Sequence, residues 1–168
     1  PVLGKFTANP IRKEAKNLLI LGGSQGARVL CHVGLNAFSR LVNRGVQLNL
    51  ILQSGEKNLE DALEVKKSLK LDAHCEVLPF IHDIANKLEW ADIVVARAGA
   101  MTLTELSLTQ IPSILVPFPH AADDHQRVNA ALWAEAGAAI LVDEKEKEFE
   151  KKLEDQIYLL AFAKNSYE

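Results

Sequence analysis

The sequence predicts an α/β fold, a doubly wound parallel sheet of about six strands with helices on both faces. Six short apolar runs alternate with segments whose apolar residues recur every three or four positions. Runs such as "NLLIL" and "DIVVA" are nearly continuously apolar, which favours strands that are covered on both sides. Right-handed crossovers between such strands produce an open sheet of this class.

The first half of the chain contains three strand–helix pairs. Val29, Leu30 and Val33 recur at helical spacing after the first apolar run, and Leu59, Leu63 and Leu69 do so after the second. We therefore expect strands at 17–23, 46–55 and 75–80, each followed by a helix, at 27–42, 58–71 and 83–91.

The second half continues the same alternation. Gly137 follows an amphipathic segment and suits the position just past the end of a helix. The last segment is highly charged but keeps helical spacing. We expect strands at 92–96, 112–118 and 138–143, followed by helices at 102–108, 124–137 and 146–164.

Composition is that of one ordinary soluble domain. The 168 residues carry 48% apolar residues, 24% charged residues and a net charge of −3, which does not suggest a nucleic-acid partner. Cys31 and Cys75 lie in or beside apolar segments and are expected to be reduced core thiols. No apolar run reaches transmembrane length and no signal peptide is visible. The chain starts at Pro1 without a methionine, which indicates a piece of something longer.

Ligands of open α/β sheets bind beyond the carboxyl ends of the strands, so the loops that follow the strands are informative. The loop "GGSQGAR" (22–28) closes the first strand and opens a helix. Its glycines would let a phosphate approach the backbone, and Ser24 adds a hydroxyl donor. The same glycines also suit a tight strand–helix turn, and neither a dinucleotide fingerprint nor a P-loop is matched.

The segment "RAGAMTLTE" (97–105) offers a second helix start beside the first. Thr102 or a neighbour begins a helix whose first amides lack partners and attract an anion. Glu105 lies about one turn in, where its carboxylate could accept hydrogen bonds from two adjacent hydroxyls of a ribose. As a first-turn acid it could instead complement the helix dipole, and the residues taken alone favour this second interpretation over ribose binding.

The segment "PFPHAADDHQRVNA" (117–130) is polar and follows the fifth strand. Asp123 or Asp124 can cap the next helix, on which Gln126 and Asn129 share a face suited to hydroxyl recognition. The His120–His125 cluster matches no metal-ligand spacing, so a polar cap is expected there and no metal.

The motifs "TANPIR", "GGSQGAR", "RAGAMTLTEL" and "PFPHAADDHQRVNA", in this order, closely resemble the MurG family over about residues 7–142. The family contains inverting N-acetylglucosaminyltransferases with the two-domain GT-B fold. The resemblance implies that residues 1–168 form a single domain, the Rossmann-like C-terminal half that binds UDP-N-acetylglucosamine. The sugar would be transferred to lipid I to give lipid II in peptidoglycan synthesis.

The resemblance also implies roles for individual residues. Arg12 matches a donor-contacting arginine, Ser24 the serine at the diphosphate, and Ile81 a residue whose backbone meets the uracil. Glu105 matches the acid that holds the ribose hydroxyls, and Gln126, or His125 beside it, the group that reads the sugar hydroxyls. The loop and helix start around the diphosphate and sugar correspond to Ala100, Met101, Thr102, Leu103 and Thr104.

Other parts of the family pattern are missing or altered. Ala8 replaces a common glycine and Cys31 a common asparagine. The family's N-terminal half carries the acceptor site, the membrane-facing patch and the general base, so this chain is expected to have no catalytic residue and to be inactive alone. The resemblance implies no cofactor and a peripheral location on the cytoplasmic face of the bacterial inner membrane, with the isolated piece soluble.

Two alternatives remain. Half of a GT-B-type UDP-N-acetylglucosamine 2-epimerase would need several acids and an arginine, whereas Glu105 is the only acid of its motif. A non-catalytic dinucleotide-binding module would need an acid closing the second strand, where Gln53 and Ser54 stand.

Overall fold

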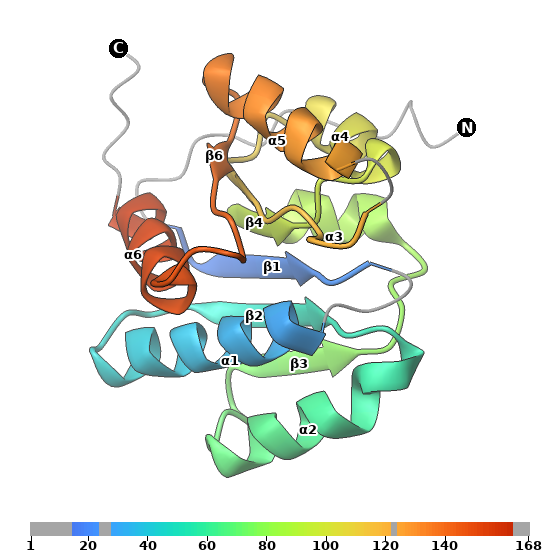
Figure 1. Ribbon diagram of the computed structural model, residues 1–168. Helices are drawn as coiled ribbons and strands as arrows, with labels where there is room; N and C mark the ends of the chain where they lie inside the picture. Colours follow the sequence, from blue (N-terminus) through green and yellow to red (C-terminus); the bar gives the residue numbers. More distant parts are fainter. Residues whose placement is uncertain (1–14, 24–27, 122–123, 163–168) are drawn as a thin grey trace.

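A computed structural model of the chain describes residues 15–23, 28–121 and 124–162. The predicted parallel sheet is confirmed (Figure 1). Its strands are β1 (Asn17–Leu21), β2 (Asn49–Gln53), β3 (Cys75–Leu78), β4 (Ile93–Ala96), β5 (Ser113–Leu115) and β6 (Ile140–Leu141). They lie in the order β3-β2-β1-β4-β5-β6, and every pair is parallel.

Six α-helices alternate with the strands as predicted. They are α1 (Arg28–Asn43), α2 (Leu59–Ser68), α3 (Ile84–Trp90), α4 (Ala100–Ser107), α5 (His125–Glu135) and α6 (Phe149–Phe162), and a 3-10 turn (Glu56–Asn58) precedes α2. None of the helices in the described ranges is long and apolar enough to cross a membrane.

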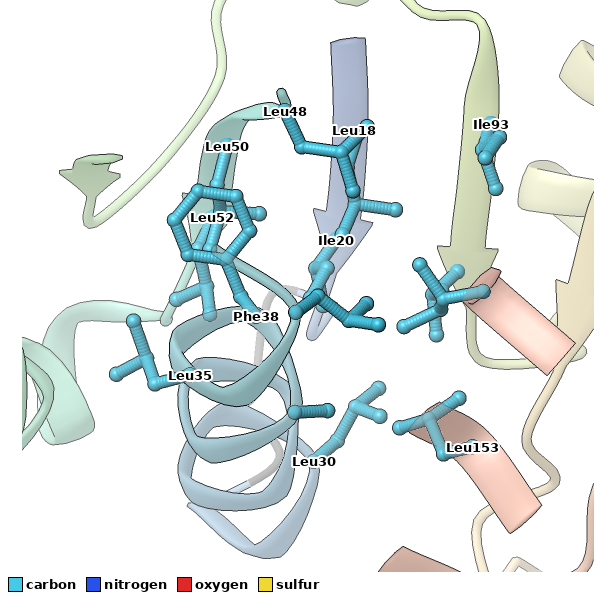
Figure 2. Close-up of a cluster of buried hydrophobic side chains, with 14 of the residues drawn as sticks. Leu18, Ile20, Leu30, Leu35, Phe38, Leu48, Leu50, Leu52, Ile93 and Leu153 are labelled. Carbon is cyan, nitrogen blue, oxygen red and sulfur yellow. The ribbon is translucent and has the colours of Figure 1, made fainter. Parts of the chain in front are cut away.

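Helices cover both faces of the sheet (Figure 1), and two clusters of apolar side chains hold them there. Alternate residues of each strand face opposite sides, so Leu18 and Ile20 of β1 join a cluster with α1, α2 and α6, while Leu19 and Leu21 join α3, α4 and α5. Figure 2 shows the first cluster, where side chains from β1, β2, β4, α1 and α6 meet, Phe38 and Leu153 among them. The near-continuous apolar strands of the sequence are therefore explained by burial on both faces.

Several element bounds differ from the predicted ones. β5 ends at Leu115 rather than 118, because Pro117 lacks the N–H that a longer ladder would need. β2 starts at Asn49 rather than 46, since Val46 donates to the carbonyl of Leu41 and completes the turn after α1. β6 is only two residues long. These differences do not alter the predicted packing, because packing depends on the alternation of strands and helices and not on the exact residues at which each element ends.

The end of α5 agrees with the prediction. Gly137 has φ 69° and its N–H bonds to the carbonyl of Ala134, while the N–H of Ala138 reaches Trp133. This pair of bonds is the Schellman arrangement, in which a residue without a Cβ stops the helix at the position that the sequence indicated.

Both cysteines are free and buried, as expected. Burial raises the pKa of the Cys75 thiol to about 12, so it stays protonated and behaves as a small apolar side chain.

Candidate functional site

The strand order reverses between β1 and β4, and this junction lies at the centre of the sheet. Leu21 and Ala96, the last residues of the two strands, are register partners. The loops that leave β1 and β4 therefore start side by side, at the place where ligands of open α/β sheets bind. These are the two loops in which the sequence predicts an anion site.

The loop after β1 is described only in part. Arg12 and Ser24 lie outside the described residues, so their predicted roles stay predictions. Arg28, the first residue of α1, contacts Asp61 of α2 at 3.2 Å, and His32 contacts the same carboxylate. The side-chain hydrogen bond with His32, and then those from Arg28, hold the pKa of Asp61 below its usual range. The contacts tie the beginning of α1 to α2.

The loop after β4 ends in an uncapped helix start. α4 begins at Ala100, two residues earlier than Thr102, with Gly99 in the N-cap position and no side-chain cap. Leu103 donates to the carbonyl of Gly99, but no described residue accepts a hydrogen bond from the amides of Ala100, Met101 or Thr102. Three N–H groups are thus left for an anion or water at the carboxyl end of the sheet.

Gly99 is a glycine that the fold itself does not require. Its φ of −73° and ψ of 148° are accessible to any residue, and a Cβ added there would meet only the Nε2 of Gln126, at 4.0 Å. Neither backbone strain nor packing within the described chain explains the missing side chain. Close approach of a ligand to the backbone would explain it.

Glu105 is the sixth residue of α4 and not a first-turn acid, so the dipole interpretation of its role is wrong. The side chain is half-buried, and burial raises the pKa of its carboxyl. Within the described ranges no hydrogen bond or ion pair satisfies this carboxylate. A partly desolvated acid without partners suits a group that accepts hydrogen bonds from a ligand.

The other predicted residues of this segment differ in what they can offer. Ala100 and Met101 are exposed, and Thr102 is partly exposed. The Leu103 side chain is buried in the core, so only its backbone could face a ligand. The Thr104 hydroxyl donates to the carbonyl of Ala100 at 2.9 Å.

Gln126 and Asn129 both reach back from α5 to the neighbouring loops. The Oε1 of Gln126 accepts the backbone N–H of Phe118 at 3.0 Å, and the Nδ2 of Asn129 donates to the carbonyl of Ala98 at 3.3 Å. Gln126 is thereby held beside Gly99, whereas His125 is exposed. The geometry favours Gln126 of the two candidates that the sequence left open.

Asp124 occupies the N-cap position of α5 but caps it with no side-chain hydrogen bond, because its backbone is left-handed at φ 53°. The predicted side-chain cap is therefore wrong for Asp124, and Asp123 lies outside the described residues. Across the described part of the chain, no group of three or more His, Cys, Asp or Glu is arranged to hold a metal ion.

Ile81 lies apart from these residues, on the loop after β3. Its side chain is buried, so a ligand could meet its backbone only. Ile81 borders a cleft of about 880 Å³ that runs along the exposed edge of β3 past Glu76 and Trp90. No residue of α4 or α5 lines this cleft, so it is not the predicted site as a whole.

One feature of the site was missed in the sequence. Arg97, directly after β4, is buried and lies against Glu144, which follows β6 and whose side chain is 12% exposed, and the two side chains approach to 2.6 Å. The pair spans 47 positions of the chain, and no local pattern links its members. A charged residue within the apolar stretch before "AGA" was the only available signal.

Comparisons with known proteins agree with this geometry. Residues 17–168 match the glycosyltransferase family 28 C-terminal domain. The chain is 38% identical over 159 residues to the UDP-N-acetylglucosamine–N-acetylmuramyl-(pentapeptide) pyrophosphoryl-undecaprenol N-acetylglucosamine transferase of Dechloromonas aromatica (strain RCB), covering 85% of this chain and 44% of that protein. It is 46% identical over 128 residues to the transferase of the same name from Halorhodospira halophila (strain DSM 244 / SL1), covering 76% and 35%.

A solved structure is similar over the same part of the chain. The crystal structure of Acinetobacter baumannii MurG matches with a TM-score of 0.73 at 33% identity, over 90% of this chain and 44% of that one. The chain thus spans less than half the length of these relatives. The dinucleotide alternative loses support, because Gln53 closes β2 and is buried, with no acid at that position.

Proposed function

The chain belongs to the glycosyltransferase family 28 C-terminal domains, and from this premise we propose that it binds the donor UDP-N-acetylglucosamine for transfer of N-acetylglucosamine. The names of its relatives give N-acetylmuramyl-(pentapeptide) pyrophosphoryl-undecaprenol as the group to which those proteins transfer N-acetylglucosamine. The family resemblance implies that the acceptor would be lipid I and the product lipid II. In this proposal residues 1–168 are the donor domain, and the acceptor binds to a second domain of the enzyme.

The observation that carries the proposal is the combination of Gly99, the uncapped start of α4 and Glu105. The three free amides and the positive end of the helix dipole would bind the diphosphate. Gly99 would let the diphosphate lie against the backbone, since only an ordinary contact with Gln126 lies where its Cβ would be.

Glu105 would bind the ribose. Each helical residue adds ~1.5 Å along the axis, so Glu105 lies roughly 7 Å from the helix start, a distance comparable to that between the diphosphate and the ribose of a nucleotide. Two ribose hydroxyls would supply the hydrogen bonds that its half-buried carboxylate lacks among the described residues.

The other predicted residues would contact the remaining parts of the donor. Gln126, with its amide nitrogen beside Gly99, would read the sugar hydroxyls. The backbone of Ile81 would meet the uracil, Arg12 would contact the donor and Ser24 would bind the diphosphate. The helix start from Ala100 to Thr104, with Met101, Thr102 and Leu103, would surround the diphosphate and sugar mainly through its backbone.

The setting of the reaction is proposed on the resemblance alone. We infer a peripheral enzyme of the cytoplasmic face of the bacterial membrane, which meets its lipid acceptor and the membrane mainly through the other domain. Donor binding would need no cofactor.

Titration of the chain with UDP, UDP-N-acetylglucosamine, UDP-glucose and NAD, followed by amide NMR shifts, tests the proposal. We expect binding of the uridine nucleotides, preference for the N-acetylglucosamine form and shifts centred on Gly99 to Glu105. Binding of NAD in preference to UDP would refute it. Release of free N-acetylmannosamine from UDP-N-acetylglucosamine would instead support the epimerase alternative.

A further inference from the structure

We propose that the buried Arg97–Glu144 pair is a positioning device, which orients the Gln126 amide for recognition of the donor sugar. The inference rests on the proposed function, because it assigns a purpose to residues that stand behind Gln126. It concerns three loops that follow β4, β5 and β6 and meet at the carboxyl edge of the sheet.

The Arg97 guanidinium is fixed from several sides. Its side chain is only 8% exposed, and its Nη1 donates to the carbonyls of Val116 and Pro117, both at 3.2 Å. The same Nη1 lies 2.6 Å from Oε2 of Glu144. Neither Oε2 of Glu144 nor Nε of Arg97 has a hydrogen-bond partner among the described residues, so Glu144 balances the buried charge by proximity and not through a well-aligned hydrogen bond. The arginine therefore binds the loop, and the glutamate keeps the arginine in place.

The fixed loop in turn orients Gln126. The guanidinium carbon of Arg97 lies 5.4 Å from the centre of the Phe118 ring, in the range of a cation–π contact. The N–H of Phe118 then donates to Oε1 of Gln126 at 3.0 Å. Because that oxygen is engaged, the amide cannot turn over, and its NH₂ group stays beside Gly99.

Stability alone is a weak reason for such a pair. A buried ion pair is often no more stabilising than apolar side chains of the same volume, because both charges must be desolvated. The pair can instead fix the position of the loop, since Nη1 of the guanidinium donates to two successive carbonyls of that loop, those of Val116 and Pro117. A binding site that discriminates between sugar hydroxyls requires its amide to be held in this way.

The test uses Glu144→Gln and Arg97→Lys, with Arg40→Lys as the matched control. Arg40 also pairs with a glutamate, Glu154, at 2.6 Å, but this pair joins α1 to α6 away from the carboxyl edge. For each variant, calorimetry gives Kd for UDP and for UDP-N-acetylglucosamine. Hydrogen exchange of the Phe118 amide, measured without ligand, reports directly on the bond to Gln126.

We expect Glu144→Gln and Arg97→Lys to weaken UDP-N-acetylglucosamine binding by about tenfold while changing UDP binding by less than about twofold. Hydrogen exchange of the Phe118 amide should accelerate in both variants. Arg40→Lys should match the parent chain in both its Kd values and its Phe118 exchange. In a Gln126→Ala background, Glu144→Gln should add little further loss, because both changes remove the same contact.

Equal losses for UDP and the nucleotide sugar, an additive loss in the Gln126→Ala background, or an unchanged Phe118 amide would overturn the proposal. The proposal would also be overturned if both Arg97→Lys and Glu144→Gln were unfolded at 25 °C, because the pair would then be required for folding itself. Failure of the parent chain to bind UDP would refute the proposed function instead, while Phe118 exchange would still decide whether the pair positions Gln126.

Discussion

Glu105 is a half-buried carboxylate whose pKa is raised by burial and which receives no hydrogen bond from the described chain. Glu105→Gln keeps the shape, removes the charge and leaves an amide that accepts at one end only. Hydrogen bonds to a charged group contribute roughly 1.5–3 kcal/mol, so affinity for UDP should fall about tenfold or more. Calorimetric titration of both proteins measures this. An equal penalty for UDP and 2′-deoxy-UDP would remove ribose recognition as the role of Glu105.

The same substitution should leave stability at neutral pH unchanged or slightly increased. Burial raises the pKa of Glu105, so the folded chain holds the proton more tightly than the unfolded chain. The stability from this group is complete below the ordinary pKa of 4.5 and is lost as the pH rises through the raised value. The difference between Glu105→Gln and the parent should therefore shrink towards pH 4 in thermal melts. A lower melting temperature for the variant at pH 7 would contradict this account.

A substitution at Gly99 can distinguish an effect on ligand binding from an effect on folding. Gly99→Ala should fold normally, because its backbone angles are ordinary and its new Cβ would have space. Donor affinity should drop about tenfold or more, since a methyl group that displaces a packed ligand typically costs ~1–3 kcal/mol. Gly45→Ala is the opposite control, because Gly45 has φ 87° and lies far from α4 in the sequence. That variant should lose stability and keep its affinity, and melting curves with UDP titrations compare the two.

For individual residues, the sequence made Glu105 and Gln126 candidates for the site but did not predict their structural surroundings. Glu105 was expected one turn into its helix, and the early start of α4 at Ala100 moved it beyond the first turn. Asp124 was expected to cap α5, and its left-handed backbone prevents this. Propensities rank residues for such positions, but tertiary contacts decide the backbone angles that a cap requires.

The start of α4 is the element on which the proposed anion site depends, and donor binding there should need no metal. Helix amides and the helix dipole offset part of the charge of a diphosphate, and Arg12 would add a positive charge. Affinity for UDP-N-acetylglucosamine should be the same with and without a chelator in the buffer. If a chelator abolished binding and a divalent ion restored it, binding of the diphosphate by helix amides alone would be wrong. His120 and His125 would then become candidate metal ligands.

The order of strands and helices was predictable because it follows from the local spacing of apolar residues. All six strands and six helices lie where the apolar spacing indicated, and Gly137 ends α5 as expected. Element ends were less predictable. Pro117 ends β5 early, and the turn closed by Val46 makes β2 begin later than predicted. Both differences depend on single backbone hydrogen bonds, one missing and one formed, which the spacing of apolar residues does not reveal.

At the scale of the whole molecule, topology brings the site together. Parallel pairing of β1 with β4 brings the ends of these two strands, Leu21 and Ala96, beside each other, and the family resemblance is confirmed by the match over residues 17–168. Arg97 and Glu144 could not be joined from the sequence, because their contact depends on the β4-β5-β6 order. Local motifs thus indicated the ligand, and long-range packing determined how the site is supported.

The last prediction concerns activity of a polypeptide of these 168 residues alone. The chain spans 35–44% of the length of the transferases that it resembles, and the proposed function assigns the acceptor and the general base to the remainder. Holding two substrates in reactive geometry can contribute ~7–11 kcal/mol to lowering a barrier, and this contribution needs both binding surfaces. We therefore expect the polypeptide to bind UDP-N-acetylglucosamine but to form no lipid II from lipid I in a radiolabel transfer assay. Glu105→Gln should lower donor binding in the same preparation, which controls for an unfolded sample. Measurable lipid II from the polypeptide would show that donor site and chemistry lie on the same domain.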